Sequence, residues 1–346
     1  MITATTPHFS FNEKPKNPTS SPAKKTFAGL LGFVLLILCS SVSFGQTTYT
    51  WNVVSGAWTT AGSWTPSRTT PATDDILVFN GSTVATATVT AVANQTIGRL
   101  RIINNATVNF TSSTIVLGAG TLARTGTAVT GIGTSFNTLF SVGDYIYTGS
   151  NSNLTQVTAI GSATTLTTLE SGTIAVSTPY SKAATITITG NQPGLDIASG
   201  SSLNVSATTP TVLNLPAAAT GSISGNVTFT GSAHVLQAAA ASGITFNSPS
   251  VFTVGAGFAG NPFGSAGQNN SVGFATGSTY QQNTTTGSNP FAKNAPSSMV
   301  VFNSGSLYRV LANVGISVSG RTYANIEINA GTYSQSNIGG LAFVCD

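Results

Sequence analysis

Charged residues are scarce in this chain. Asp, Glu, Lys and Arg make up 6% of its 346 residues, whereas 40% are hydrophobic. A disordered chain carries fewer apolar residues and more charge, so the composition excludes that class. The low charge is also atypical of a cytosolic enzyme.

A basic surface is missing as well. The formal net charge is +4, and the first 45 residues account for +3 of it through four lysines and Glu13. The rest of the chain holds eight basic and seven acidic residues and is nearly neutral. Because nucleic-acid binding rests on clustered Lys and Arg, we expect no nucleic-acid partner.

Cysteine and histidine are almost absent. After residue 45, Cys345 is the only cysteine and His234 the only histidine. One residue of each kind cannot build a structural zinc site, and a single cysteine cannot form an internal disulfide. We therefore expect no metal and no cofactor, and a fold held by burial and backbone pairing alone.

Acidic residues are also too sparse for the usual chemistry of polysaccharide enzymes, which need paired carboxylates or a carboxylate-bound Ca²⁺. The carboxylates after residue 45 are Asp74, Asp75, Asp144, Glu170, Asp196, Glu327 and Asp346. Only Asp74 and Asp75 are neighbours, and adjacent strand residues point to opposite faces. No nucleophile motif accompanies His234, which we expect to be packed in a coil or to lie at the surface rather than to be catalytic. We predict no catalytic residue and a protein that is not an enzyme.

The chain has a single long hydrophobic run. The apolar segment Phe27–Leu38 follows two lysines, and its twelve residues fall short of the about 20 that span a membrane. This arrangement is typical of a secretory signal peptide, with cleavage expected after Gly45; an uncleaved N-terminal anchor is the alternative. We predict a leader over residues 1–45, no membrane span in the mature chain, and a secreted, extracellular or outer-cell-surface location.

A spacing of apolar residues recurs through the chain. Its strongest copy has offsets of 0, 2, 8 and 10, with a turn-like run in the middle: Ile244, Phe246, Phe252 and Val254. Further copies begin at Leu100, Leu195, Val272 and Val300, and those at 244, 272 and 300 lie 28 residues apart. Weaker copies comprise Ile76, Val78 and Val84, and also Val227, Phe229 and Val235.

This spacing predicts a repeated pair of short strands. Alternation at each end gives a strand one buried face, and the Asn, Gly, Pro or Ser residues between them favour a tight corner. A β-sandwich also has short alternating strands, but it has no reason to keep these offsets. We predict an all-β fold, a right-handed parallel β-helix (solenoid), with a cap and first coils over 46–118 and further repeats over 184–346.

Residues 119–183 hold no copy of the spacing. Their G-x-G-T-x-F and V-G-D-x-I motifs, which include Gly131, Phe136 and Asp144, resemble a small all-β module of phage-tail and bacterial surface proteins. The resemblance implies a compact β insertion carried by one coil, in which Asp144 shapes a turn.

Aromatic residues gather in two places. Trp51, Trp58 and Trp64 resemble the N-terminal cap of secreted bacterial β-helix proteins, where large side chains cover the open first coil. A sugar-stacking platform is the alternative. The phenylalanines of the Gly- and Asn-rich residues 255–298 offer a similar choice between lids over the coils and exposed ligand contacts: Phe258, Phe263 and Phe291.

Across residues 49–334 the chain resembles large surface proteins of gliding and related bacteria that are exported by type IX secretion. The Trp-rich opening and the F-x-x-G-S-x-Y copies at Phe274–Tyr280 and Phe302–Tyr308 carry the likeness. Such proteins end in a sorting domain, whereas this chain stops at LAFVCD, so we interpret it as a truncated member, a fragment.

The resemblance implies a secreted or cell-surface, non-enzymatic scaffold of structural or adhesin-like function. Its expected partners are extracellular polysaccharide or other cell-surface components. The alternative is a polysaccharide-active β-helix enzyme or a carbohydrate-binding module.

Overall fold

The computed structural model describes residues 46–149, 154–330 and 344–345. Those from Gln46 onward belong to one compact unit. The predicted leader over 1–45, with its apolar run and cleavage site, lies outside the described residues, as does most of the chain end that we interpreted as truncated.

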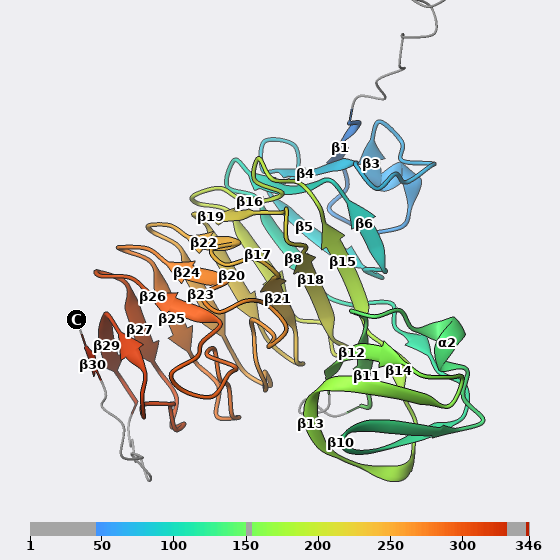
Figure 1. The fold of residues 1–346 in the computed structure, drawn as a ribbon. Helices are drawn as coiled ribbons and strands as arrows, with labels where there is room; N and C mark the ends of the chain where they lie inside the picture. Colours follow the sequence, from blue (N-terminus) through green and yellow to red (C-terminus); the bar gives the residue numbers. More distant parts are fainter. Residues whose placement is uncertain (1–45, 150–153, 331–343, 346) are drawn as a thin grey trace, which may run out of the picture. The chain divides into compact units, whose positions relative to one another are not determined.

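Parallel sheets make up most of the fold (Figure 1). The first sheet has nine strands in the order β26-β24-β22-β19-β16-β7-β4-β1-β3. Their bounds are β1 (Thr48–Trp51), β3 (Trp64–Thr65), β4 (Ile76–Asn80), β7 (Arg99–Ile103), β16 (Leu195–Ile197), β19 (Gly221–Ile223), β22 (Ile244–Phe246), β24 (Val272–Phe274) and β26 (Val300–Phe302). All pair in parallel except β3, which runs antiparallel to β1.

The second sheet also has nine strands, all parallel, in the order β2-β5-β8-β17-β20-β23-β25-β27-β29. They are β2 (Ser55–Ala57), β5 (Thr86–Thr90), β8 (Thr107–Phe110), β17 (Ser202–Val205), β20 (Asn226–Phe229), β23 (Val251–Val254), β25 (Thr279–Gln282), β27 (Leu307–Val310) and β29 (Asn325–Ile328).

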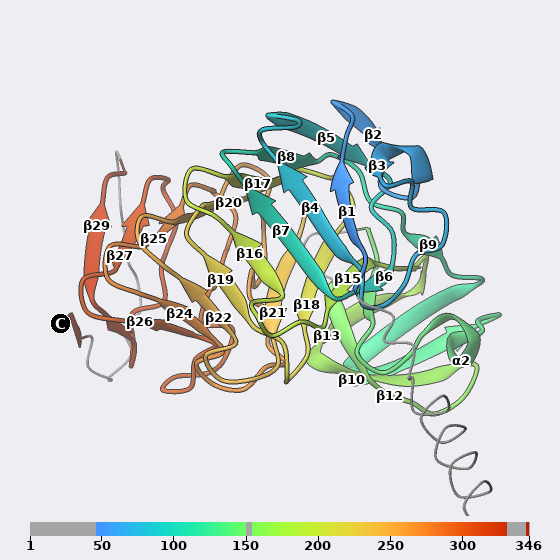
Figure 2. The same cartoon turned by 90° about the horizontal axis from the view of Figure 1, so that it is seen from above.

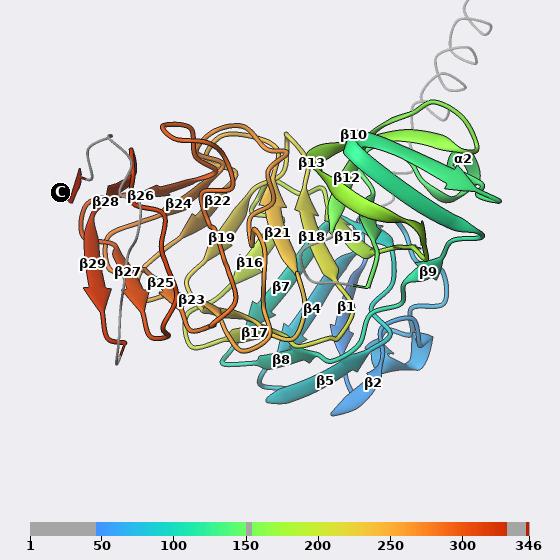
Figure 3. The same ribbon diagram turned by 90° about the horizontal axis from the view of Figure 1, so that it is seen from below.

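Two smaller parallel sheets complete this part. The third sheet runs β21-β18-β15-β6, with β6 (Gln95–Ile97), β15 (Ala184–Ile188), β18 (Thr211–Leu215) and β21 (Val235–Ala238). A two-stranded sheet pairs β28 (Thr322–Tyr323) with β30 (Val344–Cys345). Figures 2 and 3 show from above and below how strands of successive copies lie side by side.

The predicted copies lie directly on one another. Phe246 is opposite Phe274, and Phe274 is opposite Phe302, while Phe252, Tyr280 and Tyr308 form the equivalent row of the second sheet. The first strand of each of these copies has its two outer residues buried, as the alternation predicts. The 0-2-8-10 spacing is therefore confirmed as a pair of strands joined by a corner.

The weak copy at Ile76, Val78 and Val84 is wrong. Its first two positions are off by one residue, and the position opposite Val108 in the second sheet is Ala87 of β5 rather than Val84. Leu77 and Phe79 are the positions opposite Leu100 and Ile102. The run Ile76–Phe79 is apolar throughout, so it has no alternation to fix the phase, and a slip of one residue exchanges the two faces of a strand.

The weak copy at Val227, Phe229 and Val235 is wrong in a different way. Val227 and Phe229 belong to the second sheet, opposite Leu203 and Val205. The first strand of this copy is β19, where Gly221 occupies the position of the first apolar residue. From Gly221 to Ile223, Val227 and Phe229 the offsets are 0, 2, 6 and 8, so the corner is two residues shorter than the predicted spacing. Val235 lies in β21 of the third sheet.

The segment without copies forms an antiparallel sheet of its own, in the order β10-β13-β12-β11-β14-β9. Its elements are β9 (Val116–Leu117), β10 (Thr121–Ile132), α2 (Phe136–Leu139), β11 (Tyr145–Tyr147), β12 (Thr155–Ile160), β13 (Thr165–Thr178) and β14 (Ser181–Lys182). A separate apolar cluster that includes Phe136, Phe140 and Tyr180 fills it. Its strands run from Val116 to Lys182.

The three tryptophans are packed together at the β1–β3 edge of the first sheet, around η1 (Ala61–Ser63). The Trp64 ring centroid lies 5.0 Å from that of Trp51 and 5.6 Å from that of Trp58. Trp51 and Trp64 pack on Phe79, and Trp58 packs on Phe110. These indoles thus pack on Phe79 of the first nine-stranded sheet and on Phe110 of the second.

The phenylalanines of residues 255–298 point inward. Phe258 and Phe263 are fully buried, and Phe291 is nearly so. Phe263 lies among Phe246 and Phe252 of one copy and the aromatic residues of the next. These phenylalanines cover the core, which agrees with the first of our two interpretations and not with exposed ligand contacts.

Candidate functional site

The outer face of the second sheet carries an unbroken row of side chains, one from each strand. We call it the outer row, and its members are Ser55, Thr88, Asn109, Asn204, Thr228, Thr253, Gln281, Arg309 and Glu327. Parallel strands lie about 4.8 Å apart, so the row repeats at that interval. All nine side chains are polar, and seven of them are uncharged.

Contacts between neighbours hold the row in place. The Asn204 amide donates to Asn109 Oδ1 at 2.9 Å. At the other end, Arg309 Nε donates to Glu327 Oε2 at 2.9 Å, so that the two charges of the row neutralise each other. The row is therefore a straight, nearly neutral line of hydroxyl and amide groups.

The carboxylates that we considered for catalysis are dispersed. Four of them pair with cations: Asp75 with Arg68, Asp144 with Lys182, Asp196 with Arg101 and Glu327 with Arg309. Asp74 precedes β4, and Asp346 lies outside the described residues. Within the described ranges, no group of three or more His, Cys, Asp or Glu residues could hold a metal ion.

Asp144 shapes a turn, as expected. One of its oxygens, Oδ2, accepts hydrogen bonds from the Ser141 backbone N–H and from Lys182 Nζ, both at 2.6 Å. The turn before β11 is thereby joined to β14.

His234 is packed, which is the first of the two positions that we expected, and it is completely buried. Its Nδ1 accepts a hydrogen bond from the Thr211 N–H at 3.1 Å, so the proton of the neutral ring is on Nε2, 2.9 Å from the Thr230 carbonyl oxygen. Burial lowers the pKa of His234 to about 4, against the smaller opposing effect of its hydrogen bonds with the backbone of Thr230 and Ala207. The ring is a neutral link between β18 and the end of β20.

The interpretation of aromatic residues as exposed sugar platforms is wrong for those we named. Trp51, Trp58 and Trp64 are each 1% exposed, and the three phenylalanines are at most 2% exposed. Tyr280, which packs beside Phe263, is also fully buried. Their faces are covered by other aromatic rings. A sugar ring has no access to them.

A second candidate site lies where the antiparallel sheet meets the third parallel sheet. Tyr145 of β11 and Ala183 pack there against Val212 and Val235. The Tyr145 hydroxyl donates to Gln237 Oε1 at 2.5 Å. Next to this contact is a cavity of about 120 Å³, which we call the junction cavity. Its polar lining includes Arg124, Tyr145, Glu170, Ser171 and Asn261.

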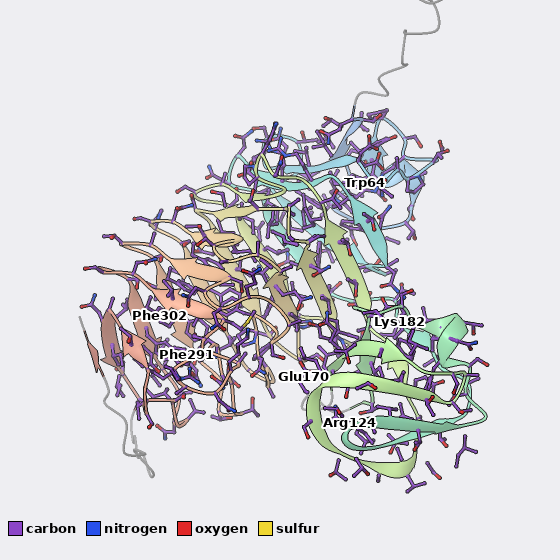
Figure 4. All side chains as sticks on the ribbon, in the orientation of Figure 1. Trp64, Arg124, Glu170, Lys182, Phe291 and Phe302 are labelled. Atoms are coloured by element: carbon purple, nitrogen blue, oxygen red, sulfur yellow. The ribbon has the colours of Figure 1, made fainter. Side chains whose placement is uncertain are left out.

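Arg124 and Glu170 are the charged groups of the junction cavity, and both are labelled in Figure 4. Arg124 comes from β10 and Glu170 from a part of β13 where the pairing with β10 shifts register. Burial lowers the pKa of Arg124, and the nearby Glu170 carboxylate opposes this. Burial also raises the pKa of Tyr145, and Glu170 adds to that increase.

A glycine allows the parallel part to approach this cavity closely. Gly264 has φ +61°, and a Cβ placed on it would lie 2.6 Å from Gln237 Oε1 and 3.2 Å from the Tyr145 hydroxyl. The adjacent Ser265 hydroxyl donates to Glu170 Oε1 at 2.5 Å. The loop around Gly264 thus links the two sheets through Tyr145 and Glu170.

Our sequence analysis did not single out this pair. One signal was present: Arg124 is the only charged residue between Arg101 and Asp144, and Glu170 is the only one between Asp144 and Lys182. An isolated charge among Thr, Ser and Gly residues on a strand is unusual in this chain, and it is the signal in the sequence that points to this site.

A comparison of this chain with protein-family models, curated proteins and solved structures finds no match. Among the described residues, no helix has the length and apolar character needed to cross a membrane.

Proposed function

We propose that this protein is a secreted or cell-surface scaffold, structural or adhesin-like and not an enzyme. The outer row is the observation that carries the proposal. A line of uncharged hydroxyl and amide groups at a fixed interval is suited to an extended, repetitive partner rather than to a small substrate. The partner class is extracellular polysaccharide or another cell-surface component.

The architecture that we propose for it is a right-handed parallel β-helix, with a cap and first coils over 46–118, an insertion over 119–183 and repeats over 184–346. The in-register rows support this, because each copy adds one strand to each nine-stranded sheet. The export route by type IX secretion remains our proposal, on the sequence resemblance alone. Finding the mature terminus near Gln46 by mass spectrometry would support it, and an intact leader would oppose it.

Sedimentation with insoluble polysaccharides tests the adhesive function. We expect the full chain to bind at least one of cellulose, chitin and an algal cell-wall preparation. Replacing Thr228 and Thr253 with Glu places two unpaired charges in the middle of the outer row, and we expect the bound fraction to fall several-fold.

The matched control is Thr245→Glu, a half-buried threonine on the opposite nine-stranded sheet. Equal losses in both variants would show that the outer row is not the binding surface. If none of the three materials binds, the polysaccharide-adhesive function is wrong. Release of new reducing ends or unsaturated products from such materials would instead favour the enzyme alternative.

A further inference from the structure

Arg124 is a buried cation with an incomplete set of partners. It is 5% exposed. Its Nη1 donates to the backbone oxygen of Glu170 at 3.3 Å, while its Nε is buried without a hydrogen-bond partner. Arg124 is also not among the four cations that pair with a carboxylate in the described part of the chain. A buried guanidinium without a counter-charge is costly, so this position has a reason beyond packing.

The Glu170 carboxylate does not supply that counter-charge by direct contact. Its Oε1 accepts from Ser265, and its Oε2 accepts from the Thr155 hydroxyl at 2.6 Å and the Gln156 N–H at 3.0 Å. A carboxylate has about four acceptor positions, so one remains for a further donor. Glu170 thus offers the junction cavity an acceptor, while Arg124 offers it donors.

The backbone around Arg124 is shaped to hold the guanidinium in place. A Cβ placed on Gly172 would lie 2.3 Å from Arg124 Nη2. Gly172 is opposite Gly126 in the β10–β13 pairing, and Gly126 has φ +63°. The absence of a side chain at Gly172 therefore leaves the space that the guanidinium of Arg124 occupies.

The chemistry of this lining selects a ligand class. A guanidinium binds an oxyanion through its planar fork of donors. A bare phosphate or sulfate would place further negative charge near Glu170, which needs a donor. A ligand with a carboxylate at one end and hydroxyl groups at the other matches both. The volume of about 120 Å³ corresponds to roughly four water molecules at about 30 Å³ each, which is enough for the carboxylate end of such a molecule.

We propose that the junction cavity binds a small hydroxylated carboxylate of the sugar-acid class, with its carboxylate on Arg124 and its hydroxyl groups toward Glu170 and Asn261. This site does not depend on the adhesive role of the outer row, which lies on a different sheet. The two proposals can therefore fail separately.

Calorimetric titration of the full chain with galacturonate tests the site, with galactose and inorganic phosphate as comparison ligands. We expect galacturonate to bind more tightly than either. Arg124→Lys keeps the charge but loses the planar fork, and we expect it to weaken galacturonate binding at least about tenfold. The control is Arg99→Lys, whose wild-type side chain donates to the carbonyl oxygens of Pro193 and Gln192; its affinity should equal that of the wild type.

Three results of the titration would overturn the proposal: no binding of galacturonate, equal binding by Arg124→Lys, or phosphate binding as tight as galacturonate. Thermal unfolding of Arg124→Met gives a second readout. Without ligand, we expect its Tm to match or exceed that of the wild type, because an unpaired buried charge is removed. Galacturonate should raise the Tm of the wild type alone. A lower Tm for Arg124→Met without ligand would assign Arg124 a purely structural role.

Discussion

Phe246 and Phe274 lie face to face, with ring centroids 4.5 Å apart and an angle of 5° between their planes. They are opposite each other in the register of β22 and β24. The stacking follows directly from the 28-residue spacing of the two copies, and Phe274 continues the row to Phe302 at 5.2 Å. The fold is thus held by like residues on like residues.

Truncating one member of this row of stacked phenylalanines should strongly destabilise the protein. We expect Phe246→Ala to lower the free energy of unfolding by about 3–5 kcal/mol, because it leaves a cavity between fully buried rings. Urea denaturation measures this. Thr245→Ala, on the other face of the same strand, should change it by less than about 0.5 kcal/mol. Similar values for both variants would contradict the assignment of the two faces.

Acid should destabilise the protein through His234. The pKa of the buried ring is about 4, below the 6.5 of an ordinary histidine, so the unfolded chain binds more protons between those values. The contribution of neutral His234 is complete above about pH 6.5 and is lost as the pH falls through 4, by up to roughly 3 kcal/mol.

Urea denaturation from pH 7.5 to 4.0 measures this loss, with His234→Asn as the control because it removes the titrating group. We expect the difference in stability between wild type and variant to shrink as the pH falls. A difference that stays constant across this range would mean that His234 does not titrate as described.

The two salt bridges Arg68–Asp75 and Arg101–Asp196 should differ in strength. The side chains of the first pair are each 2% exposed, whereas those of the second are 34% and 22% exposed. Removing one partner of a buried pair leaves a buried charge and costs about 3–5 kcal/mol, so Asp75→Asn should be strongly destabilising. Asp196→Asn should cost about 1 kcal/mol or less. Thermal or urea unfolding compares them, and equal effects would contradict the burial of the first pair.

The joint between the antiparallel and third parallel sheets should be sensitive to Gly264→Ala. The new Cβ would meet Gln237 Oε1 at 2.6 Å, at a φ of +61° that side chains rarely adopt. We expect a loss of more than about 1 kcal/mol in unfolding free energy. Gly287→Ala is the control, since a Cβ there has no neighbour within 4 Å. Faster proteolysis within 119–183 would place the damage at the joint.

The repeating part of this fold was predictable where alternation was clear. Phe246, Phe274 and Phe302 could be aligned from the sequence because polar residues separate them from the next apolar position. The alignment failed at Leu77, inside a run with no polar residue. It also failed at Gly221, which has no side chain to reveal its place and which begins a copy whose corner is two residues shorter. Patterns of hydrophobicity report strand phase only where side chains alternate in character.

The junction cavity was beyond the reach of such patterns. Arg124 and Glu170 are 46 positions apart, and the register shift between β10 and β13 decides how they face each other. Ser265 reaches Glu170 from 95 positions away. The Arg68–Asp75 pair is closer in sequence, but its burial depends on the packing of the tryptophans, which composition alone does not describe.

The 28-residue interval also makes part of the molecule adjustable in length. Because Ile244, Val272 and Val300 occupy one row, loss or duplication of 28 residues leaves every later position in that row unchanged. Recombination between neighbouring copies would therefore remove or add one strand in each nine-stranded sheet. Each such step would change the length of the sheets by one strand spacing, about 4.8 Å, and keep the remaining strands in register. A change in the number of copies would therefore alter the length of the outer row in discrete steps.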